Sequence, residues 1–231
     1  MKKLIPILAL MLIALTANAQ SCPDNHHPHI IDLGLPSGTK WACCNVDDDH
    51  SKQSPTNYGC YYAWGETEVK DVYNAVTYLY ALGVDEDGDG WYDDLHKDTD
   101  CYGVWQSLGS DIAGTKYDVA YVKWSGSWVM PSKDQIKELL ENCTYEWTTD
   151  NGVEGGKFTS KTNGYSIFLP VAGYRWDGGL HFAGRGGFYW SSTQHPSNSF
   201  GAYCLYFGSG GVYLHYNYGR NYGFSVRPVS K

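Results

Sequence analysis

The sequence lacks several features that would each have pointed to a class of protein. Beyond its first nineteen residues it has no apolar run of the roughly 20 residues that a membrane-spanning helix needs. It has no excess of basic residues either, since 17 Lys and Arg stand against 25 Asp and Glu. Because non-specific nucleic-acid binding needs a basic surface, this balance argues against a nucleic-acid partner.

Catalytic sequence motifs are missing as well. The sequence contains no G-x-S-x-G nucleophile turn, no H-E-x-x-H metal-binding helix and no phosphate-binding loop. It also shows no cysteine beside a basic partner of the kind that activates a nucleophile. These absences predict that the chain is not an enzyme. The paired carboxylates of a glycosidase stay open, because their separation is set in three dimensions.

The first residues have the pattern of a secretory signal peptide. Lys2 and Lys3 precede an uncharged stretch over residues 4–16, and Ala17-Asn18-Ala19 is a small-x-small cleavage site. We therefore expect residues 1–19 to be removed and the chain to be secreted or exported to the cell envelope. The alternative is a lipoprotein acylated at Cys22, which the alanine three residues before that cysteine disfavours.

Cleavage at this site would leave 212 of the 231 residues, enough for one domain and too few for two. We expect an N-terminal linker over residues 20–28 and a single domain over residues 29–231. The favoured interpretation of the linker is a solvated tail, although three close histidines would also suit a metal, namely His26, His27 and His29.

Aromatic residues and glycine are abundant, with 20 Tyr, 9 Trp and 27 Gly. Glycine marks turns, and amphipathic rings suit half-buried surfaces and binding sites. The composition predicts an α+β domain with short antiparallel sheets, one clear helix and long loops rich in glycine and aromatics. That helix is expected over residues 133–142, with Ser132 as N-cap and Gln135 completing a capping box.

All seven cysteines follow the expected signal peptide. An oxidising exterior permits disulfides, but an odd count leaves at least one thiol free or paired between chains, so a disulfide-linked oligomer is open. If the adjacent Cys43 and Cys44 lie on a strand, their side chains cannot point the same way.

An acidic segment has the spacing of a calcium-binding loop. Alternate carboxylates converge on one hard cation, and Gly90 permits the sharp turn that such a loop needs. Counted from Asp85, position twelve of the loop is His96 instead of the bidentate glutamate of an EF-hand. A solvated acidic turn is the competing interpretation. The expected ligands of a structural calcium ion are Asp85, Asp87, Asp89, Trp91 and Asp93.

Several segments together resemble one known family. They are His29–Ala42, Tyr62–Glu66, Asp111–Asp118, Trp128–Ser132, Phe168–Arg175, Tyr189–Ser192 and Gly223–Val229. The chain resembles the Fibrobacter succinogenes major paralogous domain, which is abundant in secreted proteins of Bacteroidetes. The departures are local, with Val129 in place of the usual arginine and Cys43 as an added cysteine.

The resemblance implies a C-type-lectin-like fold, similar to formylglycine-generating enzymes and to variable proteins of diversity-generating retroelements. It supplies no ligand, because fold alone does not fix function. Since Cys44 and Cys143 both lie in or beside family-like segments, the resemblance also suggests a disulfide between them.

A display surface is predicted near the C-terminus. Residues 202–207 and 212–218 flank Gly208-Ser209-Gly210-Gly211, which indicates a β-hairpin. Strand alternation puts Val212 and Leu214 on one face and Tyr213 on the other. The ligand-binding residues expected on the outward face and its neighbouring turns are Arg175, Trp176, Asp177, His181, Tyr213, His215, Asn217, Arg220, Asn221 and Tyr222.

The function that these patterns favour is a secreted or surface-exposed module that binds a glycan or a cell-surface protein. The competing interpretation is that tyrosine and asparagine only decorate a half-buried sheet. A structural or adhesive subunit of a surface assembly is the main alternative function. An enzyme related to formylglycine-generating proteins is the less favoured one.

Overall fold

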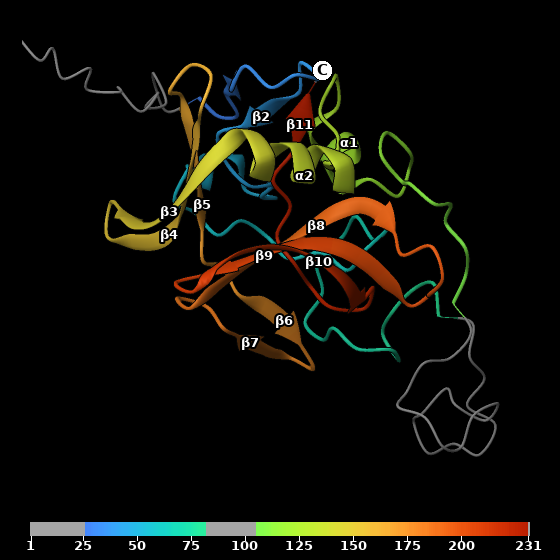
Figure 1. Ribbon diagram of the computed structural model, residues 1–231. Helices are drawn as coiled ribbons and strands as arrows, with labels where there is room; N and C mark the ends of the chain where they lie inside the picture. Colours follow the sequence, from blue (N-terminus) through green and yellow to red (C-terminus); the bar gives the residue numbers. More distant parts are fainter. Residues whose placement is uncertain (1–25, 82–104, 231) are drawn as a thin grey trace, which may run out of the picture.

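The computed structural model describes residues 26–81 and 105–230, and it shows an α+β architecture of small antiparallel sheets (Figure 1). The helical elements are η1 (His50–Lys52), α1 (Val119–Trp124) and α2 (Lys133–Asn142). The strands are β1 (Ile30–Ile31), β2 (Lys40–Ala42), β3 (Cys143–Asp150), β4 (Val153–Ser160), β5 (Ser166–Pro170), β6 (Tyr174–Trp176), β7 (Gly179–His181), β8 (Gly186–Gln194), β9 (Gly201–Gly208), β10 (Gly211–Gly219) and β11 (Val229–Ser230).

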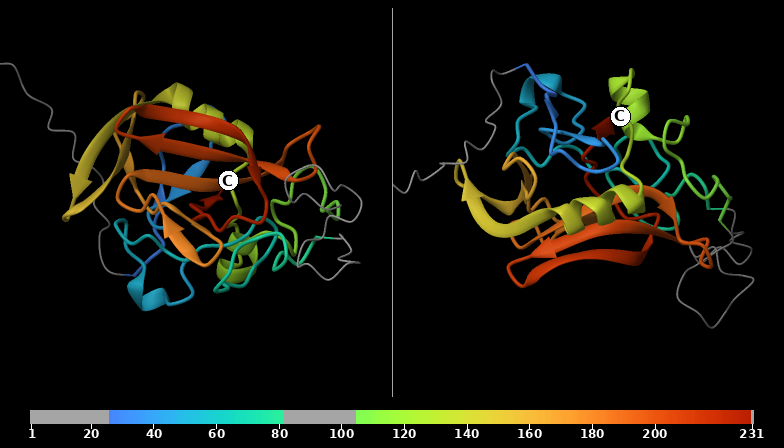
Figure 2. Two further views of the ribbon diagram at one scale, coloured as in Figure 1. Left: turned by 90° about the horizontal axis from the view of Figure 1, so that it is seen from below. Right: turned by 45° about the horizontal axis from the view of Figure 1, so that its top comes forward.

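Helix α2 begins and ends where the sequence predicts. The Ser132 hydroxyl accepts a hydrogen bond from the Gln135 amide, and the Gln135 side-chain oxygen accepts one from the Ser132 amide, which completes the capping box. Ile136 and Leu139 are buried. They pack in a core cluster with residues from the central β8–β9–β10 sheet, over which α2 lies (Figure 2).

The central sheet separates two cores because its side chains alternate between faces. Tyr189 and Leu205 are opposite each other and face the core that contains α2. Phe188 and Tyr206 are also opposite each other, and they belong to the cluster on the other face. The predicted hairpin of β9 and β10 is confirmed, with Val212 and Leu214 packed against the core on the α2 side.

The beginning and the end of the domain meet in one small sheet. Strand β11 pairs with β2, with Val229 opposite Trp41, and β1 pairs with the other edge of β2. The segments that carry the family resemblance meet nearby. The Trp190 indole donates to the Tyr62 carbonyl over 2.8 Å and stacks on Phe224 with ring centroids 4.1 Å apart.

The segment 58–66 forms irregular structure, with an isolated bridge from Tyr62 to Phe224. One expectation about this region is corrected by the structure. The expected disulfide between Cys44 and Cys143 is wrong, because Cys143 carries a free thiol. Among the described residues, no helix is long and apolar enough to cross a membrane.

Candidate functional site

The β6–β7 hairpin projects from the side of the central sheet opposite α2 (Figure 1). Its backbone is fixed on the body of the domain, because the Arg175 amide donates to the Gly223 carbonyl and the Gly223 amide donates back. A loop over residues 58–81 supports its tip. The Asp177 carboxylate accepts a hydrogen bond from the Asn74 amide over 3.1 Å, and the Asp177 amide donates to the Tyr73 carbonyl.

Aromatic rings from this hairpin and from the sheet are linked by ring contacts into one group, which we call the aromatic platform. Tyr174 stacks on both His181 and Phe182, with centroids 5.4 and 5.9 Å apart. Phe182 meets the buried ring of Phe188, which in turn contacts Tyr206. The platform consists of Tyr174, Trp176, His181, Phe182, Tyr206, Tyr213 and Tyr222.

The most regular contact in the platform is between Trp176 and Tyr222. Their ring planes are inclined by only 12° and their centroids are 6.1 Å apart, so the two rings are stacked and nearly parallel. Trp176 is 42% exposed even though it is stacked. Tyr222 is half-buried because Tyr174, Tyr218 and Phe224 also contact its ring. Trp176 therefore has solvent-exposed surface for a ligand, and Tyr222 fixes its orientation.

Tyr213 forms the far end of the platform. It faces away from Val212 and Leu214, as the strand alternation predicts, and it is 54% exposed. Its ring is nearly parallel to that of Tyr206, at an interplanar angle of 15° and a centroid distance of 6.2 Å. Tyr206 also contacts Phe188, the buried ring that Phe182 meets, so ring contacts link the sheet to the hairpin. Rigid rings already held by neighbours lose little conformational entropy when they bind a partner.

Polar groups border the platform on the hairpin, but Arg175 is not one of them. It lies between Tyr174 and Trp176 in β6 and so points to the other face, with its guanidinium over the buried Tyr61 ring, 5.5 Å from the centroid. His181 contacts the Trp176 carbonyl through Nε2 at 3.2 Å. Burial raises the pKa of Tyr218 to about 12, so its phenol is neutral over the physiological pH range. The edge of the aromatic platform on the hairpin therefore combines exposed rings with hydrogen-bonding side chains.

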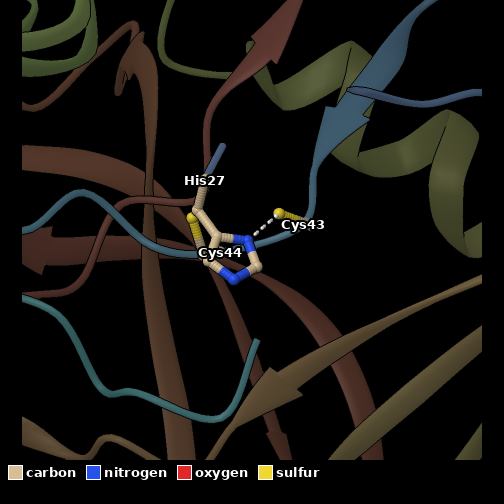
Figure 3. Close-up of side chains that lie close together, drawn as sticks. All are labelled: His27, Cys43 and Cys44. Carbon is tan, nitrogen blue, oxygen red and sulfur yellow. Dashed lines mark hydrogen bonds between the residues drawn. The ribbon is translucent and has the colours of Figure 1, made fainter. Parts of the chain in front are cut away.

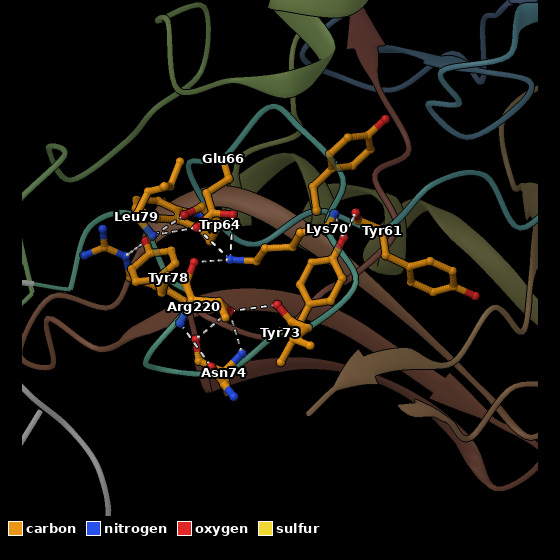
Figure 4. Close-up of polar contacts among 12 residues, drawn as sticks. Tyr61, Trp64, Glu66, Lys70, Tyr73, Asn74, Tyr78, Leu79 and Arg220 are labelled. Atoms are coloured by element: carbon orange, nitrogen blue, oxygen red, sulfur yellow. Dashed lines mark hydrogen bonds and ion pairs between the residues drawn. The ribbon is translucent and has the colours of Figure 1, made fainter. Parts of the chain in front are cut away.

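Two residues expected on the exposed surface are buried, and that part of the prediction is wrong. Arg220 is fully buried, and Asn221 is almost so. The Arg220 guanidinium donates to the Tyr78 hydroxyl and to two backbone carbonyls, and it lies 4.7 Å from the centroid of the Trp64 ring (Figure 4). Arg220 and Asn221 follow the end of β10 at Gly219, so the alternation of side chains along the strand no longer decides which way they point.

Arg220 has a structural role beneath the platform. The carbonyls that it binds belong to Gln106 and Ser199, and Tyr78 donates its hydroxyl to the Trp64 carbonyl. The same loop contains the buried Glu66, whose carboxylate contacts the Lys70 ammonium at 2.8 Å (Figure 4). These contacts hold irregular segments together where the described residues have little regular structure.

Other expected site residues lie outside what the structure describes. The backbones of His215 and Asn217 belong to β10, but their side chains are not described. The expected calcium ligands lie wholly outside the described residues; they are Asp85, Asp87, Asp89, Trp91 and Asp93. Ligand binding through His215 or Asn217, and calcium binding by the acidic segment, therefore stay predictions.

Sequence reasoning missed three platform residues, namely Tyr174, Phe182 and Tyr206. Tyr206 was assigned to a strand, and the alternation that exposes Tyr213 would also have placed its partner Tyr206 on the same face. Phe182 adopts a positive φ of 56° at the end of the hairpin, and no local pattern signals that turn.

Two grooves lie elsewhere on the domain. One of about 920 Å³ runs beside α2 and is lined by residues such as Pro36, Gln135 and Glu138. A smaller one of about 360 Å³ lies near Lys133 and Thr193. Their linings include none of the platform residues.

Comparison with known proteins gives one partial match. A family model described as a domain of unknown function (DUF8237) matches residues 145–229, which contain the central sheet and the whole aromatic platform. No curated protein and no solved structure matches the chain.

Proposed function

We propose that the chain is a secreted or cell-envelope module that binds a carbohydrate through the aromatic platform. The observation that carries this proposal is the partly exposed ring of Trp176, which lies on a supported hairpin and is held parallel to the Tyr222 ring. The face of a sugar ring carries C–H groups that pack on an aromatic plane, and its hydroxyls need hydrogen-bonding partners at the edge. Asp177 in the turn of this hairpin and His181 on β7 supply such partners.

The expected C-type-lectin-like fold belongs to the same proposal, as does membership of the Fibrobacter succinogenes major paralogous domain family. The antiparallel sheets, the meeting of the two ends of the domain and the contacts between the motif segments all support it. The signal-peptide pattern of residues 1–19 supports export. We propose no catalytic activity for the platform.

Glycan-array screening of the purified protein, followed by calorimetric titration of the best glycan, tests this function. Substituting Trp176→Ala removes the open ring and should weaken binding by roughly tenfold or more, because aromatic anchors dominate such interfaces. Tyr165→Ala is the matched control, since Tyr165 is an exposed tyrosine in the turn before β5 and outside the platform. Both variants should keep the melting temperature of the wild type.

Two results would contradict the carbohydrate proposal. One is a glycan whose affinity is unaffected by Trp176→Ala, because its site must then lie elsewhere. The other is the absence of any glycan ligand together with tight self-association that Trp176→Ala abolishes. That result would assign the platform to the structural or adhesive alternative.

A further inference from the structure

A second cluster of functional side chains lies far from the platform in sequence and contains no platform residue. His27, Cys43 and Cys44 bring one imidazole and two thiols together, with their ligand atoms all within 4.8 Å of one another (Figure 3). His27 Nδ1 lies 3.2 Å from the Cys43 sulfur. The nearby His29 adds a second imidazole, whose Nδ1 lies 3.8 Å from the same sulfur.

Strand register explains why these residues meet. Ile30 is opposite Ala42 in the β1–β2 pair, so the next pair outward places His29 opposite Cys43. The Cys43 amide donates to the His29 carbonyl over 3.0 Å, and the His29 amide donates to the Cys43 sulfur over 3.0 Å. His27 precedes β1, and its Nδ1 approaches the same Cys43 sulfur that His29 contacts.

The two adjacent cysteines approach the same histidine because they do not lie on a strand. Strand β2 ends at Ala42, and Cys43 and Cys44 form a bend after it. Arg227 holds that bend, since its guanidinium donates to the carbonyls of Ala42 and Cys43. Backbone support of this kind fixes the direction of metal-ligating side chains.

We propose that His27, His29, Cys43 and Cys44 form a zinc-binding site. Zinc favours tetrahedral sites with two sulfur and two nitrogen ligands. Zn–S and Zn–N bonds of about 2.3 and 2.0–2.1 Å place a sulfur and a nitrogen about 3.6 Å apart in a tetrahedron. The observed 3.2 and 3.8 Å lie on either side of that separation.

Charge and burial also suit this ion. Binding converts both thiols to thiolates and releases two protons to water, so two negative sulfurs balance the Zn²⁺ charge. A neutral centre is compatible with the burial of both cysteines, which are 4% and 0% exposed. A zinc ion at this site would link residues 27–29 to the end of β2. It would thereby hold this N-terminal segment against the core.

Metal titration of the reduced, metal-free protein tests the site. We expect one equivalent of Zn²⁺ to bind, and Co²⁺ in its place to show thiolate charge-transfer and tetrahedral d–d absorption bands. Cys43→Ser should weaken Zn²⁺ binding by more than the roughly 100-fold that loss of a supporting residue can cost. Cys60→Ser is the matched control, because Cys60 is a half-buried thiol outside the cluster.

Two further measurements keep the test decisive if a cysteine variant does not fold. His27→Gln changes a half-buried side chain and should remove one nitrogen ligand. X-ray absorption of the zinc-loaded wild type should show two sulfur scatterers. Binding below a tenth of an equivalent, cobalt spectra unchanged by Cys43→Ser, or a zinc shell without sulfur would each overturn the proposal. None of these results depends on carbohydrate binding.

Discussion

Gly173 lies directly against the backbone of His181 at the base of the β6–β7 hairpin. A Cβ atom at position 173 would be 2.1 Å from the His181 carbonyl oxygen and 2.4 Å from the Ala183 nitrogen. Gly173 also has a φ of +65°, a conformation that favours glycine. The position of the whole hairpin, and with it one half of the platform, therefore depends on the absence of a side chain at one residue.

The first prediction concerns this contact. Gly173→Ala should lower the free energy of unfolding by about 3 kcal/mol or more, because overpacking against backbone adds to the cost of the positive φ. Gly184→Ala is the control, since Gly184 also has a positive φ of +76° but open space around it. That control should lose only about 1 kcal/mol. Equal losses in urea denaturation would contradict the steric explanation.

The second prediction separates a structural role of Arg220 from a binding role. Arg220→Met should lower the free energy of unfolding by about 3 kcal/mol, because it leaves the carbonyls of Gln106 and Ser199 without their donor. Arg185→Met should change it by less than about 0.5 kcal/mol, since Arg185 is exposed. Chemical denaturation measures both. A stable Arg220→Met protein with altered ligand binding would return Arg220 to the binding surface.

The third prediction concerns the buried Asp118, the N-cap of α1. One carboxylate oxygen accepts from the amides of Ala120 and Tyr121, and the other accepts from those of Gly114 and Met130. Asp118→Asn puts a donor group where two amides need an acceptor, so the free energy of unfolding should fall by about 3 kcal/mol.

The control for this substitution is Asp111→Asn at an exposed site, whose carboxylate accepts one amide bond from Ala113 and a long bond from the Thr193 hydroxyl. We expect that variant to lose less than about 0.5 kcal/mol. Thermal and urea unfolding of the two proteins should rank them in this order. Similar stability for both would show that the four hydrogen bonds to Asp118 contribute less than their geometry suggests.

The fourth prediction tests the state of Cys143. Burial raises the pKa of this thiol to about 11, so at pH 8 almost none of it is the reactive thiolate. Iodoacetamide should therefore leave Cys143 unmodified in the native protein and modify it after unfolding in urea without reductant. Peptide mass spectrometry reports both states. Protection that persists in urea and disappears with reductant would restore a disulfide at this position.

The sequence predicted the local elements that carry their own signals. A capping box located α2, and a glycine-rich turn located the hairpin of β9 and β10. Strand alternation alone predicted that the Tyr213 side chain points to solvent. These features depend on neighbours in sequence, so a local pattern is sufficient to predict them.

Features built by distant segments could not be predicted in the same way. Arg220 is buried because the loop over residues 58–81 and the carbonyls of Gln106 and Ser199 close around it. Cys43 and Cys44 both approach His27 because the chain bends after β2, and strand alternation cannot predict such a bend. Trp176 and Tyr222 were both named as binding residues, but their stacking follows only from the hairpin's position on the sheet.

The pairing of β11 with β2 has a practical consequence for displaying this domain. Strand β11 lies at the side of the molecule opposite the β6–β7 hairpin (Figure 1). A tether or solid support joined beyond Ser230 would therefore hold the domain with its ring-bearing hairpin directed outward. An immobilised protein attached at this end should present the same surface to a passing ligand as the protein in solution.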